Sequence, residues 1–198
     1  EYTQKYLDLA KIWSKFPAYN KANDIIDSIT NNQVILVVSG TGSGKTVLVP
    51  KFALHTLDYK GNIAITLPKQ IIAKSAAEFS AATLDVQLGQ HVGYQYKGDS
   101  KKSDTTKLLY ATDGTIVARL LNDPLLSDFN VVIIDEAHER KVQIDFLLYL
   151  LRNTMTVRKD FKVIIMSATI NEEIFVSYFN TFKFTQINID AETHYPIQ

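Results

Sequence analysis

The sequence contains no cysteine among its 198 residues. This absence excludes a disulfide framework and a thiolate-ligated metal site. Long apolar runs are also missing, since none approaches the roughly 20 residues that a membrane-spanning helix requires, and the first residues are not a signal peptide. We therefore expect an intracellular protein, in the cytoplasm, the nucleus or a viral particle or factory, with no membrane partner. Because the sequence begins without Met, we also expect a piece of a longer polypeptide.

Net charge is absent as well, because 21 Lys and Arg residues balance 21 Asp and Glu residues. No overall positive field then attracts a polyanion, so any contact with a nucleic acid has to be local. Hydrophobic residues make up 46% of the chain and charged residues 21%, which is an ordinary globular balance. This composition excludes a disordered or fibrous chain and predicts a domain with its own core.

Short apolar runs without alternation predict strands that are buried on both faces. Stretches with helical periodicity lie between these runs and predict helices. The predicted strands are 34–38, 63–65, 108–110, 131–134 and 163–166, and the predicted helices are 46–57, 70–83, 115–121, 142–152 and 172–179. Strand and helix in alternation predict an α/β fold with a mostly parallel sheet and helices on both faces.

The two ends of this pattern differ from its centre. Apolar residues at helical spacing in 1–30 predict an N-terminal helical lead-in that docks on the core, before a main domain over 31–198. The polar stretch 97–104 has no periodicity, and we expect a loop there. The histidines show no metal-ligand spacing at His55, His91 and His194.

A glycine-rich segment directly follows the first predicted strand and opens a helix. Its residues are Gly40, Thr41, Gly42, Ser43, Gly44, Lys45 and Thr46. Such a P-loop turns successive backbone N–H groups towards phosphate oxygens, and Lys45 adds a cation while the Thr46 hydroxyl suits Mg²⁺. Gly usually occupies the place of Ser39, which is a departure from the pattern. A dinucleotide fingerprint does not fit, because it would require Gly in place of Lys45.

Two adjacent carboxylates, Asp135 and Glu136, follow the predicted strand 131–134. Hydrolysis of a nucleoside triphosphate requires one group to hold Mg²⁺ and another to orient the attacking water. Asp135 suits the first role and Glu136 the second. Taken alone, the pair could equally be an acidic turn at the start of a helix. With the P-loop upstream, we expect the two segments to meet at the carboxyl edge of the sheet.

From about residue 16 onwards, the chain resembles the first RecA-like motor domain of the DEAH-box helicases. Asp135-Glu136-Ala137-His138 spells the family name, and further segments are similar to its other motifs in the same order. These segments are Phe16-Pro17-Ala18-Tyr19 before the P-loop, Thr66-Leu67-Pro68-Lys69 (motif Ia), Tyr110-Ala111-Thr112-Asp113-Gly114 (motif Ib), Ser167-Ala168-Thr169 (motif III) and Thr193-His194-Tyr195-Pro196 at the exit.

The resemblance implies an NTP-dependent helicase that uses ATP or another NTP with Mg²⁺ and acts on single-stranded nucleic acid, with RNA favoured over DNA. It implies a catalytic role for His138, which contacts the opposite motor domain, and a coupling role for Ser167 and Thr169. It also implies a second RecA-like domain of the same polypeptide, whose arginine fingers this sequence lacks, so we expect weak hydrolysis by this chain alone. The implied nucleic-acid contacts are Lys69, Thr112, Asp113 and Gly114.

Several alternatives stay open at this point. The family usually has paired Arg in motif Ia, whereas this chain has Lys69-Gln70, so those contacts could be weaker. A DNA helicase, a P-loop kinase or transporter-type ATPase, and a nucleotide-binding scaffold without activity are the competing classes. The segment Tyr94-Gln95-Tyr96-Lys97 and the lysines of Lys101-Lys102 could stack on and attract a strand, although a packed strand and a solvated loop are favoured.

Overall fold

The structure is a computed structural model that describes residues 2–139, 143–169 and 172–189. The predicted exit segment, Thr193 to Pro196, lies outside the described residues. The described strands form one eight-stranded sheet in the order β4-β3-β5-β2-β6-β7-β1-β8. All neighbouring strands are parallel except β3 and β4. The strands are β1 Val34–Ser39, β2 Ile63–Leu67, β3 Val92–Tyr96, β4 Asp99–Lys101, β5 Leu108–Thr112, β6 Val131–Ile134, β7 Lys162–Ser167 and β8 Phe184–Ile189.

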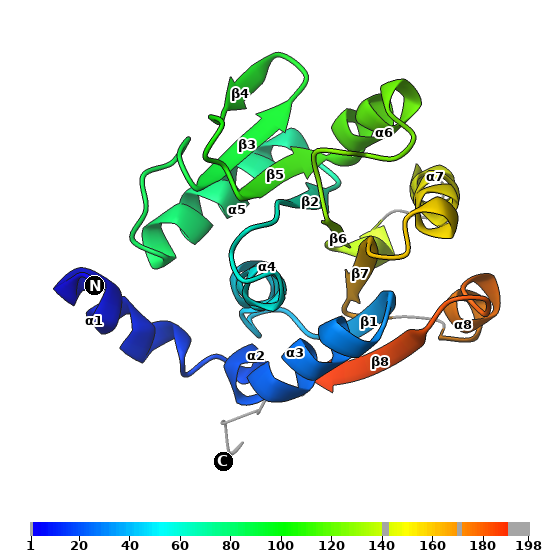
Figure 1. Cartoon of the computed structure of the whole chain (residues 1–198). Helices are drawn as coiled ribbons and strands as arrows, with labels where there is room; N and C mark the ends of the chain where they lie inside the picture. The colour runs from blue at the N-terminus through cyan, green and yellow to red at the C-terminus, as the bar shows by residue number, and fades with distance from the viewer. Residues whose placement is uncertain (1, 140–142, 170–171, 190–198) are drawn as a thin grey trace.

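Helices cover both faces of this sheet, as the sequence predicts (Figure 1). Helices α1 to α5 pack in one hydrophobic cluster, and α6 to α8 pack in a second cluster on the other face. None of the helices in the described ranges combines the length and hydropathy that crossing a membrane requires. The helices are α1 Gln4–Trp13, α2 Pro17–Asn20, α3 Ala22–Asn31, α4 Lys45–Thr56, α5 Gln70–Thr83, α6 Asp113–Asn122, the 3₁₀ helix η1 Ala137–Glu139, α7 Gln143–Val157 and α8 Glu172–Tyr178.

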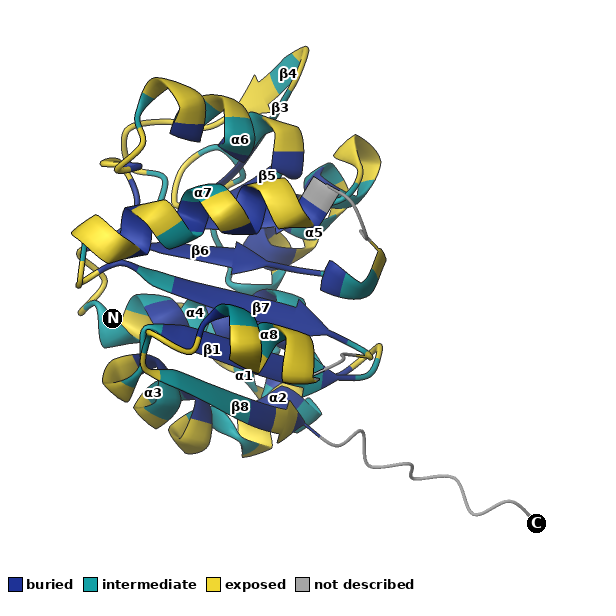
Figure 2. Cartoon of the chain, turned by 90° about the vertical axis from the view of Figure 1, so that its right-hand side faces the viewer, coloured by how far each residue is buried: buried dark blue, intermediate teal, exposed yellow. Residues whose placement is uncertain are grey.

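Strand β1 shows why the apolar runs lack alternation. Ile35 and Val37 belong to the cluster beneath α1 to α5, whereas Val34 and Leu36 belong to the cluster beneath α6 to α8. All four side chains are fully buried. Figure 2 shows the central strands as a buried layer between helices whose outer faces are exposed. Parallel strands covered on both sides need apolar residues at every position.

The N-terminal helices are part of the same core. Ile25 and Ile29 of α3 are fully buried and pack in the cluster that contains α4, as the periodicity of residues 1–30 predicts. Lys162 of β7 donates hydrogen bonds to the carbonyl oxygens of Ile29, Thr30 and Asn32 at the end of α3. These carbonyls have no partner within the helix, so the lysine caps α3 and ties it to the sheet. Burial lowers the pKa of Lys162.

The sheet contains more strands than the sequence predicts. The expected loop at 97–104 is wrong in part, because Asp99–Lys101 forms β4, antiparallel to β3. The packed-strand interpretation of the tyrosine segment is confirmed, since the hydroxyls of Tyr94 and Tyr96 both donate to Oδ2 of Asp99. Strand β8 was not predicted either. It lies at the edge of the sheet, where one side of the strand is unpaired and polar residues are tolerated.

Candidate nucleotide-binding site

The P-loop joins the carboxyl end of β1 to the start of α4. Gly42 and Gly44 have φ values of 83° and 80°, in the left-handed region that favours glycine. A Cβ atom on Gly44 would lie 2.6 Å from Cδ2 of Phe16. Both the backbone conformation and this close contact therefore exclude a larger residue at position 44. The backbone N–H of Ala18 donates to the carbonyl of Ser43 at 2.9 Å. Phe16 and the first turn of α2 therefore pack on the P-loop and hold its shape.

Lys45 is only 4% exposed and lies inside the loop. Its Nζ is 3.4 Å from the carbonyl oxygens of Ser39 and Gly40, and 4.0 Å from Oε1 of Glu136. The Ser43 hydroxyl is fully buried in the same loop, and within the described part of the chain its oxygen has no hydrogen-bond partner. A buried cation and an unsatisfied hydroxyl in a loop of inward N–H groups fit the oxygens of a phosphate chain.

Thr46 and Asp135 lie in direct contact. The Thr46 hydroxyl donates to Oδ2 of Asp135 at 2.7 Å, and Asp135 is completely buried. Burial raises the pKa of Asp135, while the Thr46 hydrogen bond and the Lys45 cation act in the opposite direction. The hydroxyl of the fully buried Tyr110 donates to the Thr46 carbonyl at 2.8 Å. The P-loop and the acidic segment thus meet as the spacing predicts, and Tyr110 steadies the first turn of α4.

Glu136 has an unusual backbone conformation, with φ at 54°. Residues other than glycine rarely adopt this left-handed conformation, and such positions are concentrated at functional sites. The Glu136 N–H donates to Oδ1 of Asp135 at 2.8 Å, which stabilises the turn. The turn directs the two adjacent carboxylates to different places. Asp135 remains buried against Thr46, whereas Glu136 lines the cavity of the P-loop.

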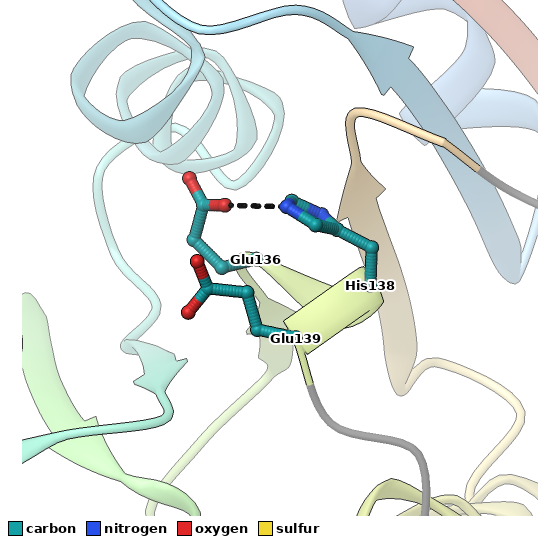
Figure 3. Close-up of side chains that lie close together, drawn as sticks. All are labelled: Glu136, His138 and Glu139. Carbon is teal, nitrogen blue, oxygen red and sulfur yellow. Dashed lines mark ion pairs between the residues drawn. The ribbon is translucent and has the colours of Figure 1, made fainter.

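His138 connects the acidic segment to motif III. Its Nε2 is 3.2 Å from Oε2 of Glu136, as Figure 3 shows. Its Nδ1 accepts a hydrogen bond from the Ala168 N–H at 3.2 Å and lies 3.2 Å from the Ser167 hydroxyl, which donates to the Thr169 carbonyl. A backbone N–H can only donate, so the ring proton belongs on Nε2, where it is donated to Glu136. The described contacts of His138 are therefore within this domain.

Glu136, His138 and Glu139 also form a cluster whose possible ligand atoms lie within 4.8 Å of one another (Figure 3). For Nε2 of His138 to ligate a metal ion, the ring proton would have to move to Nδ1. That nitrogen faces the Ala168 N–H, so two donors would then oppose each other. The hydrogen bonds therefore favour a histidine that positions Glu136 over one that ligates a metal ion.

A cavity of about 300 Å³ opens beside the P-loop. Besides the loop residues and Glu136, two aromatic side chains line it, Phe16 and Phe79. Phe79 of α5 is 54% exposed. The motifs do not reveal Phe79, because it lies inside an ordinary amphipathic helix. Only the exposure of the ring at the cavity could have suggested Phe79, and the sequence does not show exposure.

The predicted nucleic-acid contacts lie along the same carboxyl edge of the sheet. Lys69 is exposed at the start of α5, and Gly114 is exposed in the first turn of α6. Asp113 is only 5% exposed, so a bound strand would meet Thr112 and Gly114 before it. A groove of about 650 Å³ beside α6 is lined by Thr112, Gly114 and Lys97, among others. Tyr94 is 4% exposed, which leaves its ring no free face for stacking.

Motif III lies at the end of β7. Ser167 is fully buried, and Thr169 is exposed and enters the hydrogen bonds through its carbonyl oxygen. Of the two residues predicted to couple the nucleotide and strand sites, Ser167 is thus the one whose side chain contacts His138.

Comparison with known proteins agrees with this geometry. Residues 20–175 match the family model described as DEAD/DEAH box helicase. The chain is 49% identical over its whole length to "Putative ATP-dependent RNA helicase L540" of Acanthamoeba polyphaga mimivirus, of which it covers 29%. It is 40% identical over 93% of its length to the ATP-dependent RNA helicase HrpA of Borreliella burgdorferi, covering 22% of that protein.

A third relative is the DExH-box ATP-dependent RNA helicase DExH1 of Arabidopsis thaliana, which is 38% identical over 89% of this chain. The chain covers 18% of DExH1, and thus spans less than a third of each of these three relatives. The family model covers well over half of the chain, and the sheet has the mostly parallel, doubly covered architecture of a RecA-like domain. The chain belongs to the DEAD/DEAH box helicase family.

Proposed function

We propose that this chain is the ATP-binding motor domain of an RNA helicase, in which hydrolysis of the nucleotide drives movement along a single strand. The observation that carries the proposal is the convergence of the P-loop and the acidic segment. Thr46 contacts Asp135, and Lys45 lies 4.0 Å from Glu136, at the wall of one cavity. These are the groups that a triphosphate, its metal ion and an attacking water require.

In this proposal the loop N–H groups and Lys45 hold the outer phosphates. Lys45 then exchanges its contacts with the Ser39 and Gly40 carbonyls for phosphate oxygens, a short movement for a flexible side chain. Glu136 accepts a hydrogen bond from the attacking water and orients it. The contacts of its two oxygens with Lys45 and His138 hold the carboxylate at the end of the cavity.

Mg²⁺ fits the donors that the structure brings together. A hydroxyl and a buried carboxylate, Thr46 and Asp135, are hard oxygen ligands of the kind that Mg²⁺ prefers alongside water and phosphate. When bound, the ion would neutralise charge that develops on the phosphate oxygens. Burial raises the pKa of Asp135, and an adjacent cation would act against this shift by favouring the charged form.

We further propose that Phe79 offers the face on which the nucleobase stacks. Its ring is exposed and lines the cavity that contains the P-loop. Stacking on an aromatic face is tolerant of base identity, because every base has such a face. We therefore expect ATP and GTP to bind with similar affinity.

The RNA strand is expected to cross the carboxyl edge of the sheet near Lys69, Thr112 and Gly114. Contacts there position the sugar-phosphate backbone without reading the sequence, which a chain without net charge can provide locally. We propose that a second RecA-like domain of the longer polypeptide closes over the nucleotide and supplies the arginine fingers. The names of the three relatives all contain the words ATP-dependent RNA helicase, which supports RNA as the strand.

The test is ATP hydrolysis by the longer protein, with no nucleic acid, with single-stranded RNA and with DNA of the same sequence. We expect RNA to stimulate hydrolysis more than DNA. Lys45→Ala should abolish nucleotide binding, whereas Lys60→Ala, which alters an exposed lysine after α4, should not. Equal stimulation by DNA would reassign the substrate, and unchanged ATP affinity in Lys45→Ala would refute the nucleotide site.

A further inference from the structure

A second pocket lies away from the nucleotide site, near the amino ends of β3 and β5. It has a volume of about 340 Å³ and is enclosed by α1, the second half of α4, the end of α5 and the residues that follow it. This volume lies within the range of small-molecule sites, which are mostly apolar with a few polar groups. The polar and aromatic residues of its lining are Tyr2, Tyr6, Lys51, Tyr59, His91 and Lys107.

The ionisable side chains that line this pocket, apart from the tyrosines, are all basic. Two lysines, Lys51 and Lys107, and one histidine, His91, line it, and no Asp or Glu is among the lining residues. This asymmetry is local, because the chain as a whole carries no net charge. A pocket of this composition is complementary to a negative charge.

Three tyrosines line part of the pocket, beside five aliphatic side chains. The rings of Tyr2 and Tyr6 are stacked with their centroids 4.7 Å apart, at an interplanar angle of 12°. Tyr59 is 51% exposed and, at a φ of 58°, has a left-handed backbone that is rare for a bulky residue. Flat aromatic walls favour a planar ring as the ligand, because rings stack or meet edge to face.

Lys51 is the polar centre of the pocket. Its Nζ lies 3.8 Å from the centroid of the Trp13 ring and 4.9 Å from that of Tyr6, and it donates a hydrogen bond to the Tyr6 hydroxyl. None of the ion pairs found among the described residues includes Lys51. Burial lowers the pKa of this amine to about 8. The half-buried ammonium therefore lies against two rings and one hydroxyl and takes part in none of those ion pairs.

We propose that this pocket binds a small planar aromatic anion, with its ring against the tyrosine walls and its carboxylate paired with Lys51. An aromatic cation would be repelled by both lysines, although the tyrosines alone would suit it. An uncharged ring would fill the apolar space but would leave the ammonium without a counter-ion. Only an anionic ring satisfies both the tyrosine rings and the half-buried charge of Lys51. The site is independent of the proposed helicase activity.

Binding of this kind is linked to the protonation of Lys51. The anion pairs with the ammonium, so its affinity should fall as pH rises above about 8 and the amine loses its proton. The other titratable groups that face the pocket are His91, Lys107 and the phenols of Tyr2, Tyr6 and Tyr59. Burial raises the pKa of Tyr6 and of Tyr59, so these two phenols stay neutral over the same range.

The experiment compares naphthoate with naphthylmethanol, its uncharged counterpart, by calorimetric titration of this chain. At pH 7 we expect naphthoate to bind at least tenfold more tightly than the alcohol. Between pH 7 and pH 9 the affinity for naphthoate should fall by about tenfold, while the affinity for the alcohol stays constant. Saturating ATP with Mg²⁺ should leave naphthoate bound, because the P-loop lies elsewhere.

Variants localise the effect. Lys51→Met keeps the length of the side chain and should remove the preference for naphthoate, whereas Lys60→Met should retain it. His91→Gln should retain the pH dependence, since Lys51 carries it. Should Lys51→Met not fold, the pH titration of the unaltered chain still decides the matter. Equal affinity for the two probes, affinity that does not change with pH, displacement by ATP, or a preference that survives in Lys51→Met would each overturn the proposal.

Discussion

The Thr46 hydroxyl donates a 2.7 Å hydrogen bond to Oδ2 of Asp135, although the two residues lie 89 positions apart in the sequence. The contact exists because β1 and β6 are parallel members of one sheet, with β7 between them, and their carboxyl ends share an edge. It joins the two residues for which we propose a role in holding Mg²⁺, one from the P-loop and one from the acidic segment. The roles proposed for the groups around this contact can be tested one side chain at a time.

Replacing Glu136 by Gln should separate hydrolysis from binding. The amide keeps the shape of the side chain but accepts a proton poorly, so turnover in the longer protein should fall by about 10²- to 10⁴-fold. Nucleotide affinity should change little, because Lys45, Thr46 and Asp135 remain. Steady-state hydrolysis and titration with a fluorescent ATP analogue measure the two effects. Glu139→Gln is the matched control at an exposed neighbouring carboxylate, and an equal loss in that variant would contradict the role of Glu136.

Removing the ring of Phe79 should weaken nucleotide binding. Stacking of a base on an aromatic side chain contributes about 1–3 kcal/mol, so Phe79→Ala should raise the dissociation constant for ATP by about 5- to 150-fold. GTP should be affected equally, and Phe79→Trp should restore binding. Phe146→Ala removes a similarly exposed phenylalanine, 48% accessible on α7, and should have no effect. Unchanged ATP affinity in Phe79→Ala would exclude the proposed base contact.

Ser167→Ala should uncouple the nucleotide site from the strand. The substitution removes the hydroxyl that contacts His138 and donates to the Thr169 carbonyl. Coupling through such a contact is worth about 0.5–2 kcal/mol, so strand separation per ATP hydrolysed should fall by about 2- to 30-fold in the longer protein. Thr169→Ala retains the carbonyl and serves as the comparison. Equal uncoupling by both variants would show that the Ser167 contact is not the link.

The half-buried amine of Lys51 should make stability depend on pH. Its pKa is lowered to about 8 in the folded chain, so between about pH 8 and pH 10.5 the unfolded chain binds more protons than the folded one. Relative to Lys51→Met, the free energy of unfolding should therefore rise with pH across this window. Solvent screening and the Trp13 ring reduce the effect to about 1 kcal/mol. Urea unfolding of both proteins at about pH 7.5 and pH 10 measures it. A free energy of unfolding that falls with pH relative to that of Lys51→Met would contradict the assignment.

Local sequence patterns determined the central strands, the helices on both faces and the P-loop. Apolar residues at every position predict strands buried on two sides, and Val34 to Val37 are buried in that manner. Gly44, Lys45 and Thr46 are recognisable because a phosphate loop requires those residue types in that order. Strands β4 and β8 escaped prediction because their residues are polar or mixed, and pairing with a neighbouring strand, rather than local propensity, makes them strands.

Tertiary packing decided the rest. The sequence places Glu136 next to Asp135, but only the left-handed turn directs their carboxylates apart. In the sequence Phe79 is one apolar residue among others in a predicted helix. The fold places its exposed ring at the nucleotide cavity. In the sequence Lys51 has no distinguishing feature, and only the packing of α1 brings Tyr6 and Trp13 into contact with it. Exposure, burial and the partners of a charge depend on which distant segments pack together, and that information is not contained in any local run of residues.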